Sequence, residues 1–346
     1  MIWVDAMDKK GGITGSIFCL CLLMLSLSGC AEETTLPSET VTIVDSTGRS
    51  VDISCPVERI VSITSAASEV ICALDAGDRI VGRDSYSLVA PHLGDVPVVA
   101  GSSASPNIEL ILELDPDVVI ADTMLSDDLR ERIEEAGIPV IVESAWDATT
   151  VIKVVRNFGM MLDKEERAYE IIGFIEQYQY IIEERIASLE EANKPAVYFE
   201  FYKPYFTSSS GTPLDNLVTV SGGKNIAREE STRYPTASPE WVVERDPDII
   251  ISILSAAEDI TEEMLKEARE EILSRQGLNS VKAVEDDRVY VLCSAIRSGV
   301  LSIVGEFYLA KWFHPDLFED IDPEEVHEEL IQELFGQKLE GVYVYP

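Results

Sequence analysis

Basic residues are scarce in this sequence. The 346 residues include 27 Lys and Arg against 63 Asp and Glu, which gives a formal net charge of −36. No run of consecutive Lys and Arg offers a local exception, and a surface this negative repels phosphate backbones. The composition therefore excludes nucleic acid as a partner. Because 46% of the residues are hydrophobic, the chain can fill the cores of about two globular domains.

Histidine and cysteine are also rare. The sequence has three histidines, His92, His314 and His327. They do not stand at the spacing of metal ligands, so a site for a bare metal ion is not expected. Beyond residue 30 the cysteines are Cys55, Cys72 and Cys293. Free buried thiols are the expected state, with a bridge from Cys55 to Cys72 as the alternative.

Catalytic motifs are missing as well. The chain has no Gly-x-Ser-x-Gly elbow, no His-Glu-x-x-His pair, no Walker loop and no dinucleotide-binding fingerprint. The pair Gly222-Gly223 precedes Asn225 and is typical of a turn after a helix, not of a phosphate-binding loop. We therefore expect no enzyme, no catalytic residue and no intrinsic cofactor.

The sequence does contain an export signal. Two lysines precede an uncharged, mostly apolar run over residues 13–28, which ends in Leu-Ser-Gly-Cys at Cys30. This pattern indicates a secretory signal over residues 1–29, and residues 30–40 are typical of a flexible tether. The ending also resembles the lipobox of prokaryotic lipoproteins, which implies lipidation of Cys30. An uncleaved anchor helix is the alternative. In both cases the bulk of the chain is expected outside the cytoplasm, tethered to the outer face of the cytoplasmic membrane.

Short β-branched runs alternate with segments of helical periodicity along the rest of the chain. Expected strands cover residues 59–63, 79–82, 117–121, 138–142, 196–201, 248–253 and 288–292, and expected helices cover 126–136, 148–162, 261–275 and 299–313. Such alternation favours an α/β fold with mostly parallel sheets.

An internal repeat divides these layers into two lobes. The sequence ELILELDPDVVI at residues 109–120 returns as EWVVERDPDIII at residues 240–251. Each copy predicts a helix, a turn containing proline and a strand. A generic helix-to-strand turn used twice in one sheet is the alternative.

One long helix is expected between the lobes. Apolar residues recur at three-and-four spacing from Asp163 to Asn193, with a capping box at Asp163 and Glu166. At about 1.5 Å per residue this helix would run about 45 Å. The expected organisation is therefore two Rossmann-like lobes on a rigid helix: an N-terminal α/β lobe over 41–162, a linker helix over 163–193 and a C-terminal α/β lobe over 194–346.

The order of five motifs resembles a known family. They are Arg59-Ile-Val-Ser-Ile, Ala67-Ser-Glu-Val-Ile-Cys-Ala-Leu, Val81-Gly-Arg-Asp-Ser-Tyr-Ser87, Pro106-Asn-Ile-Glu109 and Ser221-Gly-Gly-Lys-Asn-Ile226. With the lipobox and the long helix, they resemble the iron-siderophore and vitamin B12 substrate-binding proteins of ABC importers. The resemblance implies a ligand held in a cleft between two lobes and delivery to an ABC permease with its ATPase subunit. The protein is expected to act as a monomer.

The resemblance also implies permease contacts. In the family an acidic residue at the head of the repeated helix in each lobe docks with arginines of the permease. The matching residues are Glu109 and Glu240. Ordinary first-turn carboxylates that favour a helix dipole are the alternative explanation.

For the ligand, the resemblance implies three aromatic residues and two arginines. These are Tyr86, Phe206, Tyr234, Arg297 and Arg83. Flat aromatic faces suit a corrin, a porphyrin or a catecholate, and a guanidinium pairs with carboxylates. Packing of the aromatic rings and surface ion pairing of the arginines are the alternatives.

The sequence also departs from the vitamin B12 binder. Two tryptophans expected there are missing, because the chain reads Gly101-Ser-Ser-Ala-Ser and Asp122-Thr-Met. The expected cargo is therefore an iron complex, either a siderophore or heme, or else cobalamin. The alternatives are a surface lipoprotein of the same fold that acts as a sensor or scaffold, and a bare-metal-ion binder.

Overall fold

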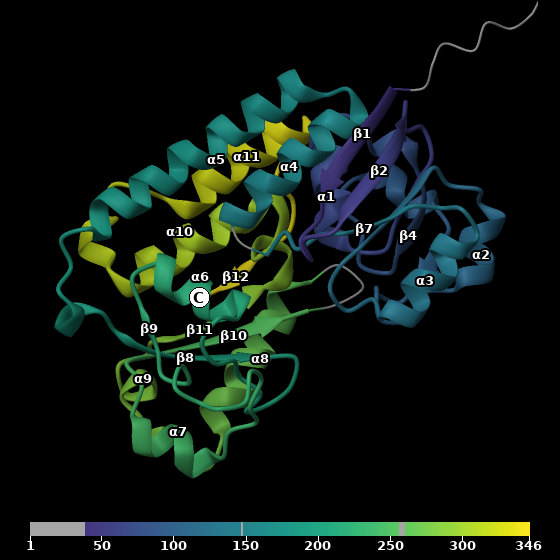
Figure 1. The fold of residues 1–346 in the computed structure, drawn as a ribbon. Coiled ribbons are helices and arrows are strands. Elements are labelled where there is room, and N and C mark those ends of the chain that lie inside the picture. The colour runs from purple at the N-terminus through teal and green to yellow at the C-terminus, as the bar shows by residue number, and fades with distance from the viewer. Residues whose placement is uncertain (1–38, 147, 256–259) are drawn as a thin grey trace, which may run out of the picture. The chain divides into compact units, whose positions relative to one another are not determined.

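The computed structural model describes residues 39–146, 148–255 and 260–346 (Figure 1). The predicted signal over 1–29, Cys30 and most of the predicted tether lie outside these residues. A hairpin of β1 (Glu39–Val44) and β2 (Ser50–Cys55) opens the described chain, so the last two residues of the predicted tether belong to a strand. The reason is burial, since Ile43 and Ile53 are fully buried. None of the helices within the described ranges is long and apolar enough to span a membrane.

The N-terminal lobe is built on a parallel sheet with strand order β5-β4-β3-β6-β7. The strands are β3 (Ile60–Ser62), β4 (Ile80–Asp84), β5 (Val98–Ala100), β6 (Val118–Ala121) and β7 (Val140–Val142). Helices α1 (Ser65–Ala73) and α4 (Ala148–Leu162) cover one face, where Ile60 and Val118 point. Helices α2 (Ile108–Glu113) and α3 (Asp127–Glu135) cover the other face, where Val61 and Val119 point. Burial on both faces explains why these strands are continuous apolar runs.

The C-terminal lobe repeats this plan with strand order β12-β11-β10-β8-β9. The strands are β8 (Ala196–Phe201), β9 (Lys224–Asn225), β10 (Ile249–Leu254), β11 (Val289–Cys293) and the antiparallel β12 (Val344–Tyr345). The flanking helices are α6 (Pro213–Val220), α7 (Pro239–Arg245), α8 (Glu262–Ser274), α9 (Lys282–Glu285) and α10 (Ser302–Phe313). The order β9-β8-β10-β11 matches β4-β3-β6-β7 of the first lobe, so the predicted α/β fold with two lobes is confirmed.

Short 3₁₀ helices complete the described elements. They are Gly77–Arg79, Pro91–Asp95, Glu191–Asn193, Leu278–Ser280, Ser294–Ile296, Gly299–Leu301 and Pro315–Leu317.

The predicted internal repeat has the same structure in both lobes. The side chains of Asn107 and Ser238 cap α2 and α7 by accepting backbone N–H groups of the first turn. Both helices are followed by an aspartate in the left-handed region, Asp115 with φ of 46° and Asp246 with φ of 40°. Aspartate tolerates this conformation better than most side chains, and the proline that follows prevents further helix.

The linker helix is shorter than predicted. Helix α5 spans Glu165–Ile186, 22 residues, which corresponds to about 33 Å. The predicted capping box is wrong, because Asp163 has φ of 57° and forms the tight turn between α4 and α5. The two helices pack closely at Gly159, where a Cβ would lie 2.6 Å from Cβ of Ala168. The predicted helical end is also wrong, since residues 187–193 contain no α-helix.

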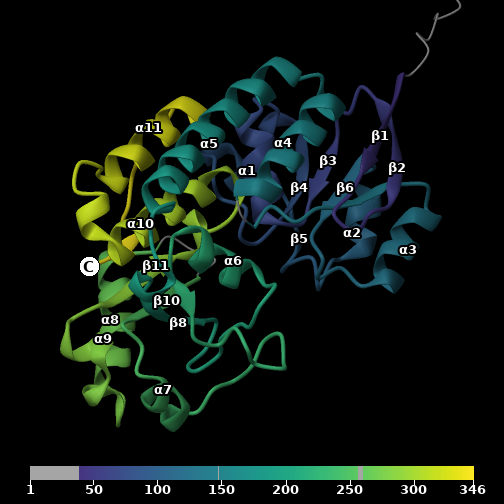
Figure 2. The ribbon, with the colours of Figure 1, turned by 60° about the vertical axis from the view of Figure 1, so that its left-hand side comes forward.

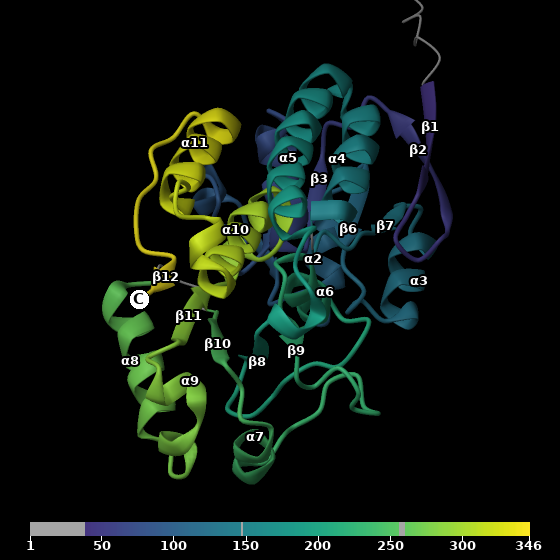
Figure 3. The same ribbon diagram turned by 90° about the vertical axis from the view of Figure 1, so that its left-hand side faces the viewer.

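A shared layer of helices lies along α5. Helix α11 (Pro323–Phe335) contacts both α10 of the second lobe and α1 of the first. Figures 2 and 3 show α11 beside α10. Three polar contacts from α5 reach this region: Tyr178 donates to Glu329 (2.7 Å), Arg185 pairs with Asp320 (2.6 Å), and Arg167 donates to the carbonyl of Glu333 (2.7 Å). One apolar cluster runs through both lobes, and residues 38–346 form one compact unit.

The three cysteines of the described residues are free, as expected. Cys72 and Cys293 are buried and Cys55 is half-buried, and burial raises the pKa of the Cys72 thiol to about 12. His314 follows α10 and packs at the helix end, with Nε2 3.0 Å from the carbonyl oxygen of Gly222.

Candidate ligand-binding site

Three of the predicted ligand residues follow the carboxyl ends of strands in the C-terminal lobe. Phe206 comes after β8, Tyr234 after β9 and Arg297 after β11. In open α/β sheets the carboxyl ends of parallel strands are the usual place for a ligand.

Phe206 and Tyr234 belong to a cluster of four aromatic side chains, Phe201, Tyr202, Phe206 and Tyr234. The rings of Phe206 and Tyr234 are stacked, with centroids 6.3 Å apart and an interplanar angle of 24°. Phe201 lies 5.0 Å from Phe206 and 6.1 Å from Tyr234, and Tyr202 lies 6.3 Å from Phe206. Tyr202 is 85% exposed and Tyr234 40% exposed, so the aromatic cluster presents ring surface to solvent. Such a surface offers a large apolar area with few rotamers to freeze.

Backbone pairing brings these rings together. The N–H of Thr207 donates to the carbonyl of Pro235 (3.0 Å), and the N–H of Ala237 donates to the carbonyl of Tyr205 (2.8 Å). Residues 205–209 and 233–237 therefore form a short antiparallel ladder beyond the sheet. Tyr202 and Tyr205 both have positive φ, at 67° and 63°. This conformation is unfavourable for tyrosine and must be held by its surroundings.

A buried ion pair supplies that support. Arg275 donates two hydrogen bonds to the carboxylate of Glu200, at 2.7 and 2.8 Å, and its guanidinium lies 4.8 Å from the ring centroid of Tyr205. The same carboxylate accepts the N–H of Tyr205 at 2.7 Å. The side chains of Glu200 and Arg275 are 4% and 9% exposed. The pair thus fixes the segment that carries Phe206.

Arg297 is half-buried, and its guanidinium lies 4.9 Å from the ring centroid of Trp146. Within the described part of the chain no hydrogen bond or ion pair holds this guanidinium. Burial lowers the pKa of Arg297 to about 10, although Tyr234 and Cys293 act in the opposite direction. A desolvated cation of this kind attracts an anionic or strongly polar ligand group.

Trp146 is a site residue that the sequence reasoning missed. It follows β7 of the N-terminal lobe, whereas Arg297 belongs to the C-terminal lobe, so this contact joins the two lobes. Its position in the sequence could have indicated this role, since Trp146 is the first aromatic residue after a predicted strand end. The stacked cation and indole mark the place where the two lobes meet.

The two predicted ligand residues of the N-terminal lobe, Tyr86 and Arg83, differ in their exposure to solvent. Tyr86 follows β4 and is 46% exposed. Arg83 is buried, and its guanidinium donates to the carbonyls of Leu93 (2.6 Å) and Asp84 (2.9 Å). These backbone contacts hold the guanidinium of Arg83, so we leave this residue out of the site proposed below.

Buried carboxyl groups lie near Tyr86. Burial raises the pKa of Asp84 to about 6, and burial also raises the pKa of Asp122. Asp84 accepts a hydrogen bond from Ser87, and the Ser87 hydroxyl lies 2.8 Å from that of Ser68. These polar groups lie at the carboxyl ends of β4 and β6.

The predicted docking residues occupy equivalent exposed positions. Glu109 lies in the first turn of α2 and Glu240 in the first turn of α7. A backbone N–H and the Ser238 side chain lower the pKa of Glu240. Both carboxylates therefore also have the geometry of ordinary first-turn residues.

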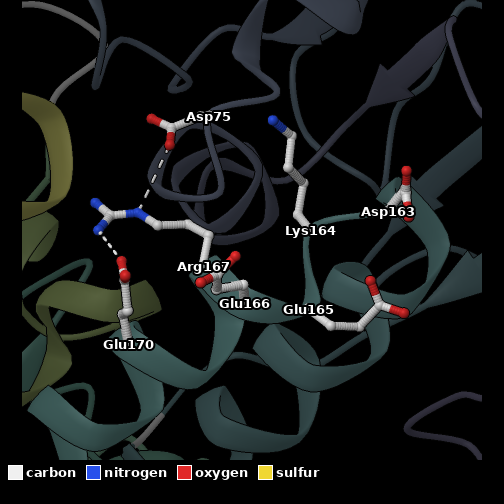
Figure 4. A pocket seen from close by; sticks show the side chains of 7 residues that line it. All are labelled: Asp75, Asp163, Lys164, Glu165, Glu166, Arg167 and Glu170. Atoms are coloured by element: carbon white, nitrogen blue, oxygen red, sulfur yellow. Dashed lines mark hydrogen bonds and ion pairs between the residues drawn. The ribbon is translucent and has the colours of Figure 1, made fainter.

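A separate cavity of about 490 Å³ lies at the start of α5 (Figure 4). Its lining residues are Asp75, Asp163, Lys164, Glu165, Glu166, Arg167 and Glu170. Arg167 pairs there with Glu170 at 2.9 Å and with Asp75 at 3.7 Å. The lining contains no aromatic side chain and none of the predicted ligand residues, so we do not assign the ligand to this cavity. Across residues 39–146, 148–255 and 260–346, no group of three His, Cys, Asp or Glu residues is placed to hold a metal ion.

Comparison with known families settles the classification. The family described as Periplasmic binding protein matches residues 60–295, which is more than half of the chain. The chain belongs to this family. Its members bind substrates and are not enzymes, so the predicted family and the predicted lack of catalysis are confirmed.

Several relatives of this periplasmic binding protein are known. It is 25% identical over 331 residues to the uncharacterized ABC transporter substrate-binding lipoprotein YvrC of Bacillus subtilis, an alignment that covers 91% of this chain and 100% of YvrC. It is 26% identical over 220 residues to a cobalamin-binding protein of Halobacterium salinarum, covering 62% of this chain and 59% of that protein. It is 23% identical over 235 residues to the high-affinity heme uptake system protein IsdE of Staphylococcus aureus, covering 68% and 78%.

A solved structure agrees with the fold. The TroA-like periplasmic binding protein FepB of Veillonella parvula superposes with a TM-score of 0.72 at 28% identity, covering 88% of this chain and 99% of FepB. The arrangement of two α/β lobes with parallel sheets is therefore shared.

Proposed function

We propose that this periplasmic binding protein is the extracytoplasmic substrate-binding lipoprotein of an ABC importer, and that its cargo is an iron complex, either a siderophore or heme, or cobalamin. The name of YvrC supports the transport role, and the names of the other two relatives support cobalamin and heme as candidate cargoes. The ligand binds where Trp146 and Arg297 meet and extends over the aromatic cluster.

The guanidinium of Arg297, unpaired among the described residues, is the observation that carries this proposal. In a chain with 63 acidic residues, a half-buried arginine without a carboxylate partner in the described ranges is unexpected unless a ligand supplies one. The indole of Trp146 and the aromatic cluster, whose Tyr234 acts on the charge of Arg297, suit a flat macrocycle or a catecholate. A carboxylate of a siderophore or heme would pair with Arg297, and an amide of a corrin side chain would accept its hydrogen bonds.

Anchoring and delivery use other parts of the chain. Lipidation at Cys30 would hold the protein at the outer face of the cytoplasmic membrane, with α5 as the rigid connection between lobes. Glu109 and Glu240 would each meet one subunit of the permease, because they stand at equivalent positions of the repeat.

A titration tests the cargo. The compact unit of residues 38–346 is titrated with hemin, cyanocobalamin and a ferric catecholate while intrinsic fluorescence is recorded. We expect saturable quenching by one of these probes and at least about tenfold weaker binding for Arg297→Gln. The matched control is Arg228→Gln, which changes an exposed arginine of the same lobe and should leave affinity unchanged. Failure of all three probes to bind, or equal affinity for Arg297→Gln, would refute the proposal.

A further inference from the structure

A buried carboxyl group of the N-terminal lobe forms hydrogen bonds with the backbone of the C-terminal lobe close to Arg297 in the sequence. Glu69 lies on α1 and is 7% exposed. Its Oε1 accepts the N–H of Leu301 at 2.8 Å, and the carboxyl also accepts the N–H of Val300. Burial raises the pKa of Glu69 to about 8, although these two bonds lower it. Among the described residues the carboxyl has no cationic partner, and its hydrogen bonds are with the backbone of the other lobe.

The turn held by Glu69 requires glycine. Gly299 has φ of 68°, and a Cβ built there would lie 2.3 Å from Oε1 of Glu69. A side chain is therefore excluded both by the backbone conformation and by the carboxyl itself. The N–H of Gly299 donates to the carbonyl of Ala145 at 2.7 Å, which adds a second bond between the lobes.

These bonds are adjacent in sequence to the residues that meet at the proposed ligand site. Ala145 precedes Trp146, and Gly299 follows Arg297 with only the buried Ser298 between them. The contact of Arg297 with Trp146 and the bond from Gly299 to Ala145 therefore lie side by side on the same two segments. Glu69 closes the far end of the turn by fixing Val300 and Leu301. With the turn held at both ends, little backbone freedom remains to Arg297.

We propose that Glu69 is a positioning residue for Arg297: its carboxyl holds the turn Gly299–Leu301 against the N-terminal lobe and so sets the guanidinium over Trp146. This inference rests on the proposed ligand site. It can be tested in the protein without any cargo, because Glu69, Arg297 and Trp146 all belong to this chain.

The first test uses the tryptophan contact in the free protein. Within residues 38–346 the tryptophans are Trp146, Trp241 and Trp312, so Trp241→Phe with Trp312→Phe leaves Trp146 as the only reporter. In this background Glu69→Leu should shift Trp146 emission and increase its quenching by acrylamide, because Arg297 leaves the indole. Glu69→Gln keeps an acceptor oxygen and should restore most of the original signal.

The control separates positioning from general loss of stability. Ile71→Ala removes buried contacts from the same helix and leaves the Glu69 carboxyl in place. It should lower thermal stability without changing Trp146 emission below the unfolding transition. If Glu69→Leu behaves like Ile71→Ala, with lower stability and an unchanged Trp146 signal, Glu69 is merely structural and the inference is wrong.

The second test uses affinity for the probe that binds in the titration above. Glu69→Leu should weaken binding at least about tenfold. The double variant Glu69→Leu with Arg297→Gln should bind the probe only slightly more weakly than Glu69→Leu alone. Additive losses in the double variant would contradict the inference. If no probe binds the unaltered protein, the proposed function fails, whereas the emission experiment still decides the role of Glu69.

Discussion

Replacement of Arg275 by methionine tests how the site is held in shape. Methionine fills much of the arginine volume but leaves the Glu200 carboxylate, 4% exposed, without its bidentate partner. Breaking a buried ion pair in this way typically costs about 3–5 kcal/mol. Loss of the cation–π contact with Tyr205 adds roughly 0.5–1 kcal/mol. Set against a typical stability of about 5–15 kcal/mol, the expected loss is large.

The matched variant removes the charge that is left behind. In Glu200→Gln with Arg275→Met the amide oxygen still accepts the N–H of Tyr205, and no uncompensated buried carboxylate remains, because Glu271, the other partner of Arg275, is exposed to solvent. We expect the cost to fall to roughly 1–3 kcal/mol, that of an unsatisfied buried polar group.

Urea unfolding of residues 38–346, followed by circular dichroism, measures both variants. The reasoning would be refuted if Arg275→Met cost less than about 1 kcal/mol, or if the double variant were no more stable than the single one. Ligand affinity should fall with Arg275→Met as well, since the pair supports the segment that carries Phe206 and the strained Tyr205.

Three further predictions concern docking and pH. Glu109→Lys with Glu240→Lys should abolish uptake in cells and leave ligand affinity intact. The control, Glu113→Lys with Glu244→Lys, changes equivalent exposed positions of the repeat and should preserve uptake. Equal uptake by both variants would exclude the docking role. Burial lowers the pKa of His327 to about 4, and both ring nitrogens lack a partner among the described residues. Below about pH 6.5 the unfolded chain therefore binds a proton at His327 that the folded protein does not bind. The free energy of unfolding should fall by about 3 kcal/mol as the pH drops from roughly 6.5 to 4. His327→Phe should remove this loss in acid unfolding curves, and an unchanged pH dependence would contradict the assignment. Because burial lowers the pKa of Arg297 to about 10, affinity for an anionic probe should hold near neutral pH and fall as the pH rises through about 10. A constant affinity there would contradict the lowered pKa.

Much of the fold could be predicted because its signals are local. The helix Ala148–Leu162 and the strand Ala196–Phe201 have the predicted bounds, since apolar periodicity ends where the chain meets its turns. The repeat also predicted two lobes, and the structure adds that their strand orders match. The short strands β5, β9 and β12 were missed, because two or three residues carry no periodicity and pair only once the rest of the sheet exists.

The linker shows where periodicity misleads. Its apolar spacing continues to about Leu189, but α5 ends at Ile186, and Asp163 forms a left-handed turn where the sequence suggested a cap. Close packing of α4 on α5 at Gly159 decides that turn, and such a contact between helices leaves no trace in the spacing of one of them. The sequence likewise did not reveal that α11 would return to α1, because a contact between distant segments depends on the completed fold.

The site was predictable only in part, for a similar reason. Phe206, Tyr234 and Arg297 could be proposed because they match the family pattern, and Phe206 and Arg297 also follow predicted strands. The roles of Trp146 and Glu69 arise from contacts with the other lobe, which the sequence does not show. For Arg83 the residue type suggested a ligand, whereas its guanidinium is held by two backbone carbonyls, which only the folded loop supplies.

The crystal structure of residues 38–346 with its bound probe tests the central claim most directly. The account predicts that a carboxylate or amide oxygen of the probe lies within hydrogen-bonding distance of Arg297, with the flat part of the probe against Trp146 or the rings of Phe206 and Tyr234. A probe seated elsewhere, for example in the charged cavity around Arg167 at the start of α5, with Arg297 untouched, would contradict it.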